Sequence, residues 1–273
     1  MVQIFNEDCI NTIKNRLKEN SVDLVLTSPP YNNSRTSHTE YCMQTSNCRY
    51  DAYDDNKTNE EYCSWVCDIF NNLDRVIKKD GCILWNVSYG IENPTCMFEC
   101  ISEICKNTNF TIADVLVWKK KSAFPNNVSS NKLTRICEFV FVFCRADEYY
   151  TFHTNKKVVS IQPRTGQKFY QNIFNLIEAE NNDGANELNN ATYSTDFCLQ
   201  LLNIYAKQSS EVTVYDPFMG TGTTALACKR YGVNCFGSEL SEKQCEYANE
   251  RIKFNGNVPD KSLIDDNKES LWS

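Results

Sequence analysis

VTVYDPFMGTGTT, residues 212–224, joins an apolar strand to a helix through a glycine-containing turn. Its first residues predict a buried strand that ends at Asp216. Gly220 and Gly222 then permit a tight turn into a helix that begins near Thr223. Glycines let a ligand approach the backbone closely, and the start of a helix offers unpaired N–H groups. The stretch therefore predicts an α/β fold with a ligand site beside this turn.

The next predicted strand, 234–238, ends at Glu239, which lies seventeen residues after Gly222. An acid at this place can accept hydrogen bonds from the two hydroxyls of a ribose. The chain carries neither the Gly-Lys-Ser/Thr of a phosphate loop nor the GxGxxG run of a dinucleotide site. A nucleoside cofactor without a pyrophosphate fits this pattern, and S-adenosylmethionine is the natural candidate. The alternative is a plain strand-to-helix turn with a solvated Glu239.

A second run, Thr27-Ser28-Pro29-Pro30-Tyr31, closes the strand-like stretch 21–26 almost two hundred residues earlier. The amino group of adenine or cytosine is a poor nucleophile because its lone pair is delocalised into the ring. Ser28 Oγ and the Pro29 carbonyl can accept its two protons, and consecutive prolines hold that carbonyl rigidly. Tyr31 can stack on a base swung out of its helix. We predict that Ser28, Pro29, Pro30 and Tyr31 form the catalytic run.

Strands and helices alternate along the rest of the chain, which predicts a Rossmann-like α/β fold: a mostly parallel seven-stranded sheet with helices on both faces. Strands are expected at 2–5, 22–27, 81–87, 111–118, 138–144, 213–216 and 234–238. Helices are expected at 9–18, 59–77, 96–107, 195–205, 223–230 and 242–254. We expect one methyltransferase domain over residues 1–254, followed by a polar tail at 255–273.

Composition excludes several classes of protein. The chain has 273 residues, a hydrophobic content of 41% that suffices for a core, and no apolar run long enough to cross a membrane. Its fifteen cysteines show no CxxC pair, so we expect buried reduced thiols and no metal site. We expect an intracellular protein, cytoplasmic in a prokaryote or nuclear in a eukaryote.

Basic residues are concentrated in one segment although the net charge is −7. Between residues 119 and 168 they outnumber the acids, and such a segment can contact phosphates. We expect DNA-contacting inserts at 32–57 and 145–190, where the strand–helix alternation is interrupted. The DNA contacts predicted here are Asn32, Arg35, Lys119, Lys121, Lys156, Lys157, Arg164 and Lys168. The alternative for the basic segment is a solvated face.

Together these runs resemble the amino-methyltransferases that act on DNA bases. That family writes its amine motif as Asp/Asn/Ser-Pro-Pro-Tyr/Phe and its cofactor motif as Asp-Pro-Phe-x-Gly-Ser/Thr-Gly-Thr-Thr. Here the amine motif comes first, which resembles the β ordering of the family and favours DNA over protein or ribosomal RNA as substrate. The resemblance extends from about Gln3 to Ile252.

The resemblance implies further roles. Asp8 matches an acid near the cofactor adenine, and the runs 118–120 and 137–139 match strands on the catalytic side. The run 189–194 stands where the family has a His-Pro-containing run, but here the His and both prolines are absent. A homodimer is also implied. The cofactor contacts predicted from the motif and the resemblance are Asp8, Asp216, Phe218, Gly220, Thr221, Gly222, Thr223 and Glu239.

The target base is the open point. Within the family, Ser at position 28 favours cytosine N4, whereas Asn32, the run 49–51 and the segment 172–184 look more like adenine enzymes. We predict methylation of adenine N6 in DNA. Cytosine N4, an RNA adenine substrate and an inactive DNA-binding homologue stay as alternatives.

Overall fold

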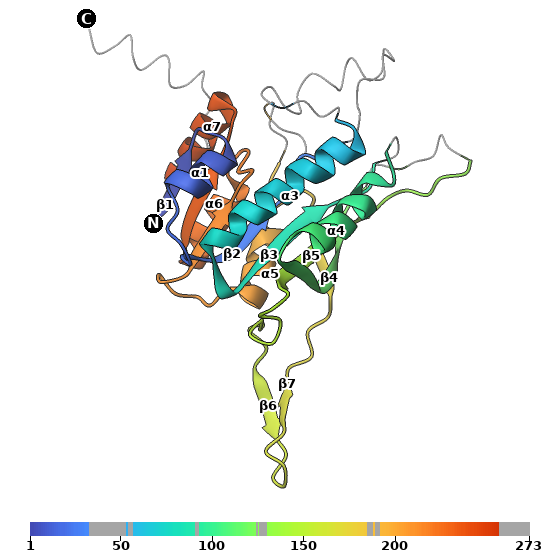
Figure 1. The fold of residues 1–273 in the computed structure, drawn as a ribbon, viewed down its shortest axis with the longest axis vertical. Helices are drawn as coiled ribbons and strands as arrows, with labels where there is room; N and C mark the ends of the chain where they lie inside the picture. The colour runs from blue at the N-terminus through green and yellow to red at the C-terminus, as the bar shows by residue number, and fades with distance from the viewer. Residues whose placement is uncertain are drawn as a thin grey trace, which may run out of the picture.

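A central sheet with helices packed on both faces forms the body of the molecule (Figure 1). The structure is a computed structural model that describes residues 1–32, 53, 57–90, 93–123, 125, 130–184, 188 and 192–256. Among these residues, no helix is both long enough and apolar enough to span a bilayer. The described cysteines are free thiols, and most of them are buried.

Eight strands form the central sheet in the order β1-β10-β9-β2-β3-β5-β4-β8. β5 is antiparallel to both of its neighbours, and the other strands all run parallel to one another. Their bounds are β1 Val2–Phe5, β2 Val22–Thr27, β3 Ile77–Val87, β4 Phe110–Lys120, β5 Cys137–Arg145, β8 Leu176–Ala179, β9 Thr213–Asp216 and β10 Asn234–Ser238.

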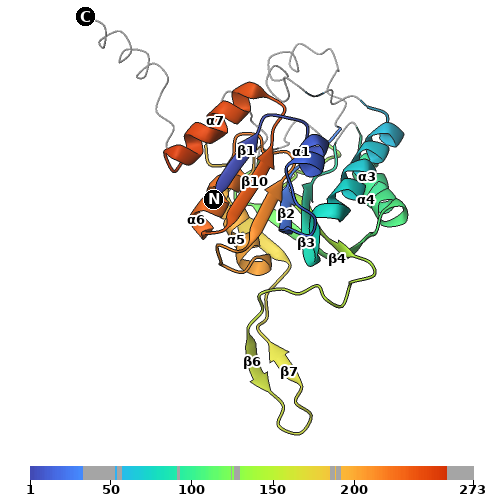
Figure 2. The same cartoon turned by 60° about the vertical axis from the view of Figure 1, so that its left-hand side comes forward.

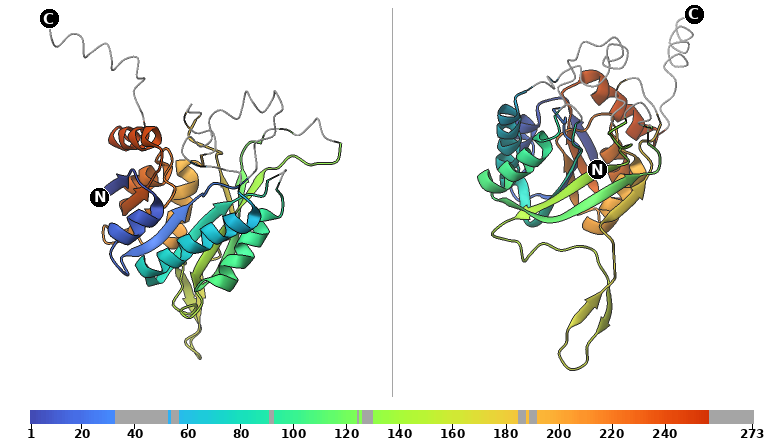
Figure 3. Two further views of the ribbon diagram at one scale, coloured as in Figure 1. Left: turned by 45° about the horizontal axis from the view of Figure 1, so that its top comes forward. Right: turned by 90° about the vertical axis from the view of Figure 1, so that its right-hand side faces the viewer.

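The helices divide between the two faces of this sheet (Figure 3). α1, α3 and α4 lie on one face, and α5, α6 and α7 lie on the other. Their bounds are α1 Cys9–Asn15, α3 Asn59–Val76, α4 Cys96–Asn107, α5 Thr195–Tyr205, α6 Thr223–Tyr231 and α7 Glu242–Lys253. The resulting three layers leave the carboxyl ends of the parallel strands at one edge.

Two hydrophobic cores follow from the alternation of side chains along each strand. In β2, Val25 packs into the core beneath α1, α3 and α4, whereas Leu24 and Leu26 pack into the core beneath α5 and α6. In β3, Trp85 and Leu84 divide in the same way. Because both faces of these strands are covered, they read in the sequence as continuous apolar runs.

The predicted fold class is confirmed, and each of the seven expected strands is present. The sheet has one more strand than predicted, β8, which pairs in parallel with β4 at the edge. It lies within the segment 145–190 that was assigned to an insert. β8 has only four residues, and alternate ones are exposed, so its apolar signal is too weak for detection from sequence.

A two-stranded hairpin projects away from the body between β5 and β8 (Figures 1 and 2). It consists of β6 Val158–Ile161 and β7 Lys168–Tyr170, which pair antiparallel. β5 runs against its parallel neighbours, so its end at Arg145 lies at the edge where those strands begin. The hairpin therefore leaves the sheet at the edge opposite the carboxyl ends of the parallel strands.

Candidate active site

The two sequence motifs meet because β2 and β9 are neighbours in the sheet. Leu24 pairs with Val214 and Val25 with Tyr215, so both strands end at the same level. Thr27 Oγ1 donates a hydrogen bond of 2.5 Å to Asp216 Oδ1 across this junction. This bond joins residues separated by 189 positions in the chain, behind the wall of the site.

Asp216 lies inside this wall with only 1% of its surface exposed. Besides Thr27, its carboxylate accepts hydrogen bonds from the Phe218 backbone N–H at 3.0 Å and from the Tyr193 hydroxyl at 3.2 Å. Burial raises the pKa of the Asp216 carboxyl, and hydrogen bonds from Thr224, Thr27 and the Phe218 backbone oppose that rise. Asp216 was predicted as a cofactor contact, but it does not line the cavity described next. In this position its carboxylate shapes the loop that follows β9.

An open cavity lies between the two motifs at the carboxyl edge of the sheet. Its empty volume is about 1080 Å³, counting the space open to solvent. Of the residues predicted from sequence, it is lined by Asp8, Ser28, Pro29, Pro30, Tyr31, Phe218, Gly220, Thr221, Thr223 and Glu239. The switch of chain connections at this edge is the usual place for a ligand in an open α/β sheet.

The glycine turn after β9 follows the predicted course, but its two glycines have different tasks. Gly220 has a φ of +53° and lines the cavity. Gly222 has a φ of +83° and precedes α6, where a Cβ would lie 2.8 Å from the Cβ of Ala248 in α7. Gly222 does not line the cavity, and its lack of a side chain allows α6 and α7 to pack closely.

Thr221 lines the cavity, and its side-chain hydroxyl is buried. Its residue surface is 1% exposed, and its Oγ1 has no hydrogen-bond partner within the described part of the chain. A buried hydroxyl without a partner is unfavourable by about 1–3 kcal/mol. Because Thr221 also lines the cavity, its hydroxyl is a candidate ligand contact.

Glu239 lies at the carboxyl end of β10 and is half-buried at the rim of the cavity. Its Oε2 accepts a hydrogen bond of 2.7 Å from the Gly220 N–H, and its Oε1 accepts one of 2.9 Å from the Ser241 N–H. Asp8 lines the same rim and caps α1 through a bond from the Ile10 N–H.

The Ser-Pro-Pro-Tyr run forms the other side of the cavity. The Tyr62 hydroxyl of α3 donates a bond of 2.6 Å to the Pro30 carbonyl, which holds the run against the helix. Ser28 Oγ lies 2.9 Å from the Tyr31 hydroxyl. Within the described residues, no donor bonds to the Pro29 carbonyl.

Aromatic rings line the cavity beside this run, and Trp65 is the one that sequence analysis missed. Its ring centroid lies 5.5 Å from that of Phe218 and 5.2 Å from that of Tyr53, and all three residues line the cavity together with Tyr31. A tryptophan at an apolar position of α3 is indistinguishable in sequence from a core residue, so no local signal identified it.

A polar network behind Tyr31 also escaped prediction as part of the site. The Tyr31 hydroxyl lies 3.1 Å from Glu138 Oε2 and 3.4 Å from Asn86 Oδ1. Glu138 in turn forms an ion pair with Lys120 at 2.5 Å. The runs 118–120 and 137–139 carry the signal that could have found it, because the family resemblance already pointed to them.

The residues predicted to contact DNA do not form one surface. Asn32 is completely buried, and its side chain bonds to both backbone groups of Lys57, so the predicted DNA contact does not fit its position. Lys119 is paired with Glu178 at 2.6 Å and Lys121 with Glu180 at 3.1 Å. Arg35 and most of the insert 32–57 lie outside the described residues.

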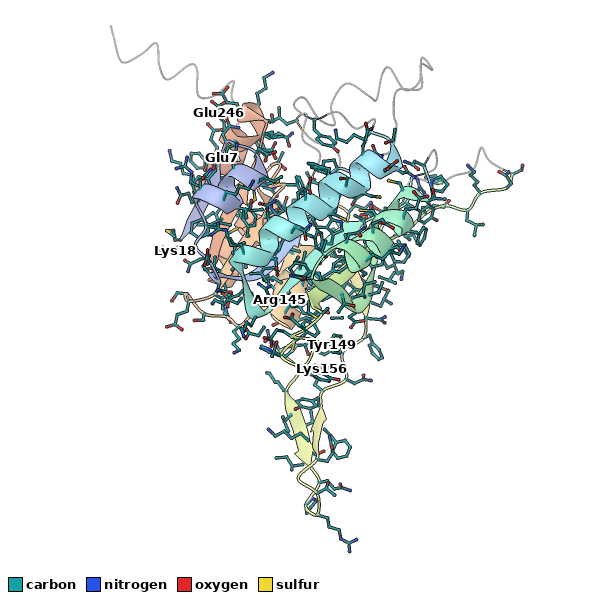
Figure 4. All side chains as sticks on the ribbon, in the orientation of Figure 1. Glu7, Lys18, Arg145, Tyr149, Lys156 and Glu246 are labelled. Atoms are coloured by element: carbon teal, nitrogen blue, oxygen red, sulfur yellow. The ribbon has the colours of Figure 1, made fainter. Side chains whose placement is uncertain are left out.

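The remaining predicted DNA contacts lie on or beside the β6–β7 hairpin: Lys156, Lys157, Arg164 and Lys168. Figure 4 places Lys156 at the base of the hairpin, whereas Glu7, which lines the cavity, lies near the other end of the molecule. The cavity and these basic residues therefore face different directions. The described residues also hold no cluster of three or more side chains suited to bind a metal ion.

Comparison with known proteins agrees with this geometry. The model of a family described as DNA methylase, the N6/N4 methyltransferases, matches residues 22–250. The orphan methyltransferase M.BamHII of Bacillus amyloliquefaciens is 26% identical over 88% of this chain and 92% of its own length.

Two solved structures share the fold. The PvuII DNA methyltransferase, titled cytosine-N4-specific, superposes with a TM-score of 0.70 at 15% identity, over 97% of this chain and 90% of that one. A putative DNA modification methylase from Thermus thermophilus, complexed with S-adenosyl-L-methionine, gives a TM-score of 0.61 at 16% identity, over 94% of this chain and 96% of that one.

Proposed function

We propose that this chain, which belongs to the N6/N4 family of DNA methylases, transfers a methyl group from S-adenosylmethionine to the N6 amino group of adenine in DNA. One observation carries the proposal. The Ser28–Tyr31 run and the turn after Asp216 line one cavity, and the hydrogen bond from Thr27 to Asp216 joins their two strands. Residues 1–254 act in this proposal as a single methyltransferase domain.

The cavity fits the cofactor by the chemistry of its walls. When bound, S-adenosylmethionine supplies an electrophilic methyl group. Glu239 and Asp8 at the rim offer carboxylate acceptors for a nucleoside, and Glu239 is held in place by two backbone N–H groups. Thr221 offers a buried hydroxyl that lacks a partner within the described chain. The Thermus relative of the same fold has this cofactor in its structure.

The opposite wall fits a flipped base. Ser28 and Pro29 line this wall, and in our proposal Ser28 Oγ and the Pro29 carbonyl accept the two protons of an exocyclic amine. Tyr31, Tyr53 and Trp65 add flat apolar surface on which a base can stack. Transfer then needs no covalent enzyme intermediate, since the amine attacks the methyl group directly.

Adenine is the acceptor we propose, and cytosine N4 is the second candidate because Ser28 favours it within the family. The deciding experiment incubates the protein and labelled cofactor with duplex DNA, single-stranded DNA and RNA. Mass spectrometry of the digested product distinguishes N6-methyladenine from N4-methylcytosine. We expect label in DNA as N6-methyladenine. Label in RNA alone, or DNA binding without transfer, would overturn the proposal.

The hairpin supports a different role from the DNA contact predicted for it. Between residues 149 and 177 the chain has four basic side chains and no acid, although the whole chain has a net charge of −7. Val159 is 64% exposed, Phe169 51% and Phe174 74%, and an isolated two-stranded hairpin is marginally stable in water. We propose that it docks on the acidic body of a second copy, which would complement its charge and cover its apolar side chains.

Sedimentation velocity at low and high salt tests this dimer. We expect the wild type to sediment as a dimer and the double variant Val159→Ser, Phe169→Ser as a monomer. Leu133→Ser is the matched control, because Leu133 is 89% exposed but lies outside the hairpin. A monomeric wild type would refute the dimer. If the wild type is a monomer and the hairpin variant loses DNA binding, the hairpin contacts DNA, as the sequence predicted.

A further inference from the structure

We propose that Glu138 is a positioning residue that makes Ser28 a hydrogen-bond acceptor toward the target amine. It acts through a chain of hydrogen bonds that runs from Ser28 through Tyr31 to Glu138. The inference rests on the proposed amine methylation. It explains how Ser28, whose hydroxyl could also donate, serves as an acceptor in that reaction. A serine hydroxyl can donate or accept, whereas the amine requires an acceptor.

The chain of contacts is continuous from the cavity wall to the protein interior. Ser28 lines the cavity, and its Oγ lies 2.9 Å from the Tyr31 hydroxyl. That hydroxyl lies 3.1 Å from Glu138 Oε2. Asn86 Oδ1 is a weaker neighbour at 3.4 Å, and its Nδ2 donates to the Phe139 carbonyl at 3.0 Å.

Counting protons fixes the direction of this chain. The Tyr31 hydroxyl has one proton, and both Glu138 Oε2 and Asn86 Oδ1 can only accept it. Because Glu138 is closer and charged, it takes the proton in a charge-assisted bond. The Tyr31 oxygen is then left to accept from Ser28, so the Ser28 proton points away from the cavity.

Lys120 forms an ion pair with Glu138 at this half-buried place. Their ion pair measures 2.5 Å, and the two side chains are only 25% and 14% exposed. Glu138 pairs across the strands with Trp118, so Lys120 is its diagonal neighbour on the same face of the sheet. The cation compensates a carboxylate that would otherwise be costly to bury.

The consequence appears at the cavity. With its proton committed to Tyr31, Ser28 Oγ presents lone pairs to the ligand, as the Pro29 carbonyl does. Both protons of an exocyclic amine then find acceptors, which favours a nitrogen lone pair directed at the methyl donor. A carboxylate at position 28 would be an acceptor without such help, whereas a serine depends on Tyr31 and Glu138.

Glu138→Gln tests the direction because it reverses the chain at nearly constant shape. The Gln carbonyl oxygen faces the Lys120 ammonium, so its amide N–H₂ faces Tyr31. Of the acceptors left for the Tyr31 proton, Ser28 Oγ at 2.9 Å is closer than Asn86 Oδ1 at 3.4 Å, so we expect Tyr31 to donate to Ser28 and the Ser28 proton to turn toward the amine. We expect the single-turnover methylation rate to fall by about 100-fold, as when one preorganised polar contact is lost. Cofactor affinity measured by calorimetry should stay within about twofold.

A rescue variant separates this role from a structural one. Adding Ser28→Asp to Glu138→Gln supplies an acceptor that can receive both the Tyr31 proton and an amine proton. We expect the single-turnover rate of this double variant to be at least about tenfold higher than that of Glu138→Gln. Ser28→Asp alone should be slower than the double variant, because two carboxylates then compete for the one Tyr31 proton.

Glu148→Gln is the control, since it breaks the ion pair with Lys79 at the opposite edge of the sheet and should keep the wild-type rate. Folding of each variant is checked by its unfolding midpoint. A Glu138→Gln rate equal to the wild type, or a double variant no faster than Glu138→Gln, would overturn the inference while methylation stands. A wild type that methylates no nucleic acid would refute the proposed function and this inference together.

Discussion

Thr27 donates its hydroxyl proton to Asp216 over 2.5 Å, and both side chains are buried where β2 and β9 end. This bond links the strand that leads into the amine-binding run with the strand that leads into the glycine turn. The two strands come from opposite ends of the chain and already pair along their backbones, so the bond adds a side-chain link between them beside the cavity. It thereby holds the two walls of the cavity in register.

Thr27→Val removes the hydroxyl with almost no change in shape. We expect the free energy of unfolding to fall by about 1.5–3 kcal/mol, the range for a hydrogen bond to a charged group. Urea unfolding measures the change. Thr213→Val is the control, because Thr213 lies on β9 and no described group bonds to its hydroxyl. Equal effects of the two substitutions would remove the special role of Thr27.

Asp216→Asn should change how stability depends on pH. Burial raises the pKa of Asp216 above its ordinary value, so the folded state favours the protonated form. The contribution of this group is fully present below the pKa of the unfolded chain and is lost as pH rises through the folded pKa. The wild type should therefore lose stability relative to Asp216→Asn as pH rises from about 4. Urea unfolding across this range would show a constant difference if the pKa were not raised.

Glu239→Ala should weaken cofactor binding. The carboxylate holds the Gly220 and Ser241 N–H groups, and in our proposal it also accepts from the ribose. Loss of a hydrogen bond to a charged group corresponds to about 10- to 100-fold in affinity. Calorimetry with S-adenosylmethionine gives the value. Glu242→Ala, at the start of α7, should bind like the wild type, and an unchanged Glu239→Ala would withdraw the assignment.

Thr221→Val should separate stability from binding. The Thr221 hydroxyl has no partner among the described residues, so its replacement by a methyl group should leave the unfolding free energy unchanged or slightly higher. If the cofactor uses this hydroxyl, affinity should fall by about 5- to 10-fold. Thermal unfolding and calorimetry on the same sample provide both numbers. A loss of stability without a loss of affinity would show that the hydroxyl serves the fold.

Tyr31→Ala and Tyr31→Phe should differ in a defined way. The alanine variant loses the ring, and stacking of a base on an aromatic side chain is worth about 1–3 kcal/mol. The phenylalanine variant keeps the ring but loses the hydroxyl that bonds to Ser28 and Glu138. We expect single-turnover methylation to be slowest in Tyr31→Ala, with cofactor affinity nearly intact in both. Normal turnover in Tyr31→Ala would refute stacking.

Much of the site followed from short runs of sequence. The runs that follow Thr27 and Asp216 were predicted to share a site, and the structure brings them to one cavity, because carboxyl ends of parallel strands meet at one edge. Gly220, Thr221 and Glu239 line the cavity as expected. These residues lie within a few positions of a strand end, so local pattern was enough to place them.

Other roles depended on contacts between distant segments. Asp216 was predicted to face the ligand, but Thr27 and Tyr193 surround its carboxylate and hold it inside. Asn32 was predicted to contact DNA, yet its buried side chain forms hydrogen bonds with the Lys57 backbone. In both cases the sequence beside a motif is the same whether the polar side chain points to a ligand or to the interior, so sequence alone does not distinguish the two.

The sequence by itself determined the α/β class, the two motifs and their order, because strand period, glycine turns and paired prolines are local properties of the chain. Tertiary structure alone decided which side chains form the cavity, the connection from Ser28 to Glu138, and the direction of the hairpin. Hydrogen bonds such as that between Tyr31 and Glu138 join residues 107 positions apart. Their geometry arises only when strand order and antiparallel β5 bring the two segments together.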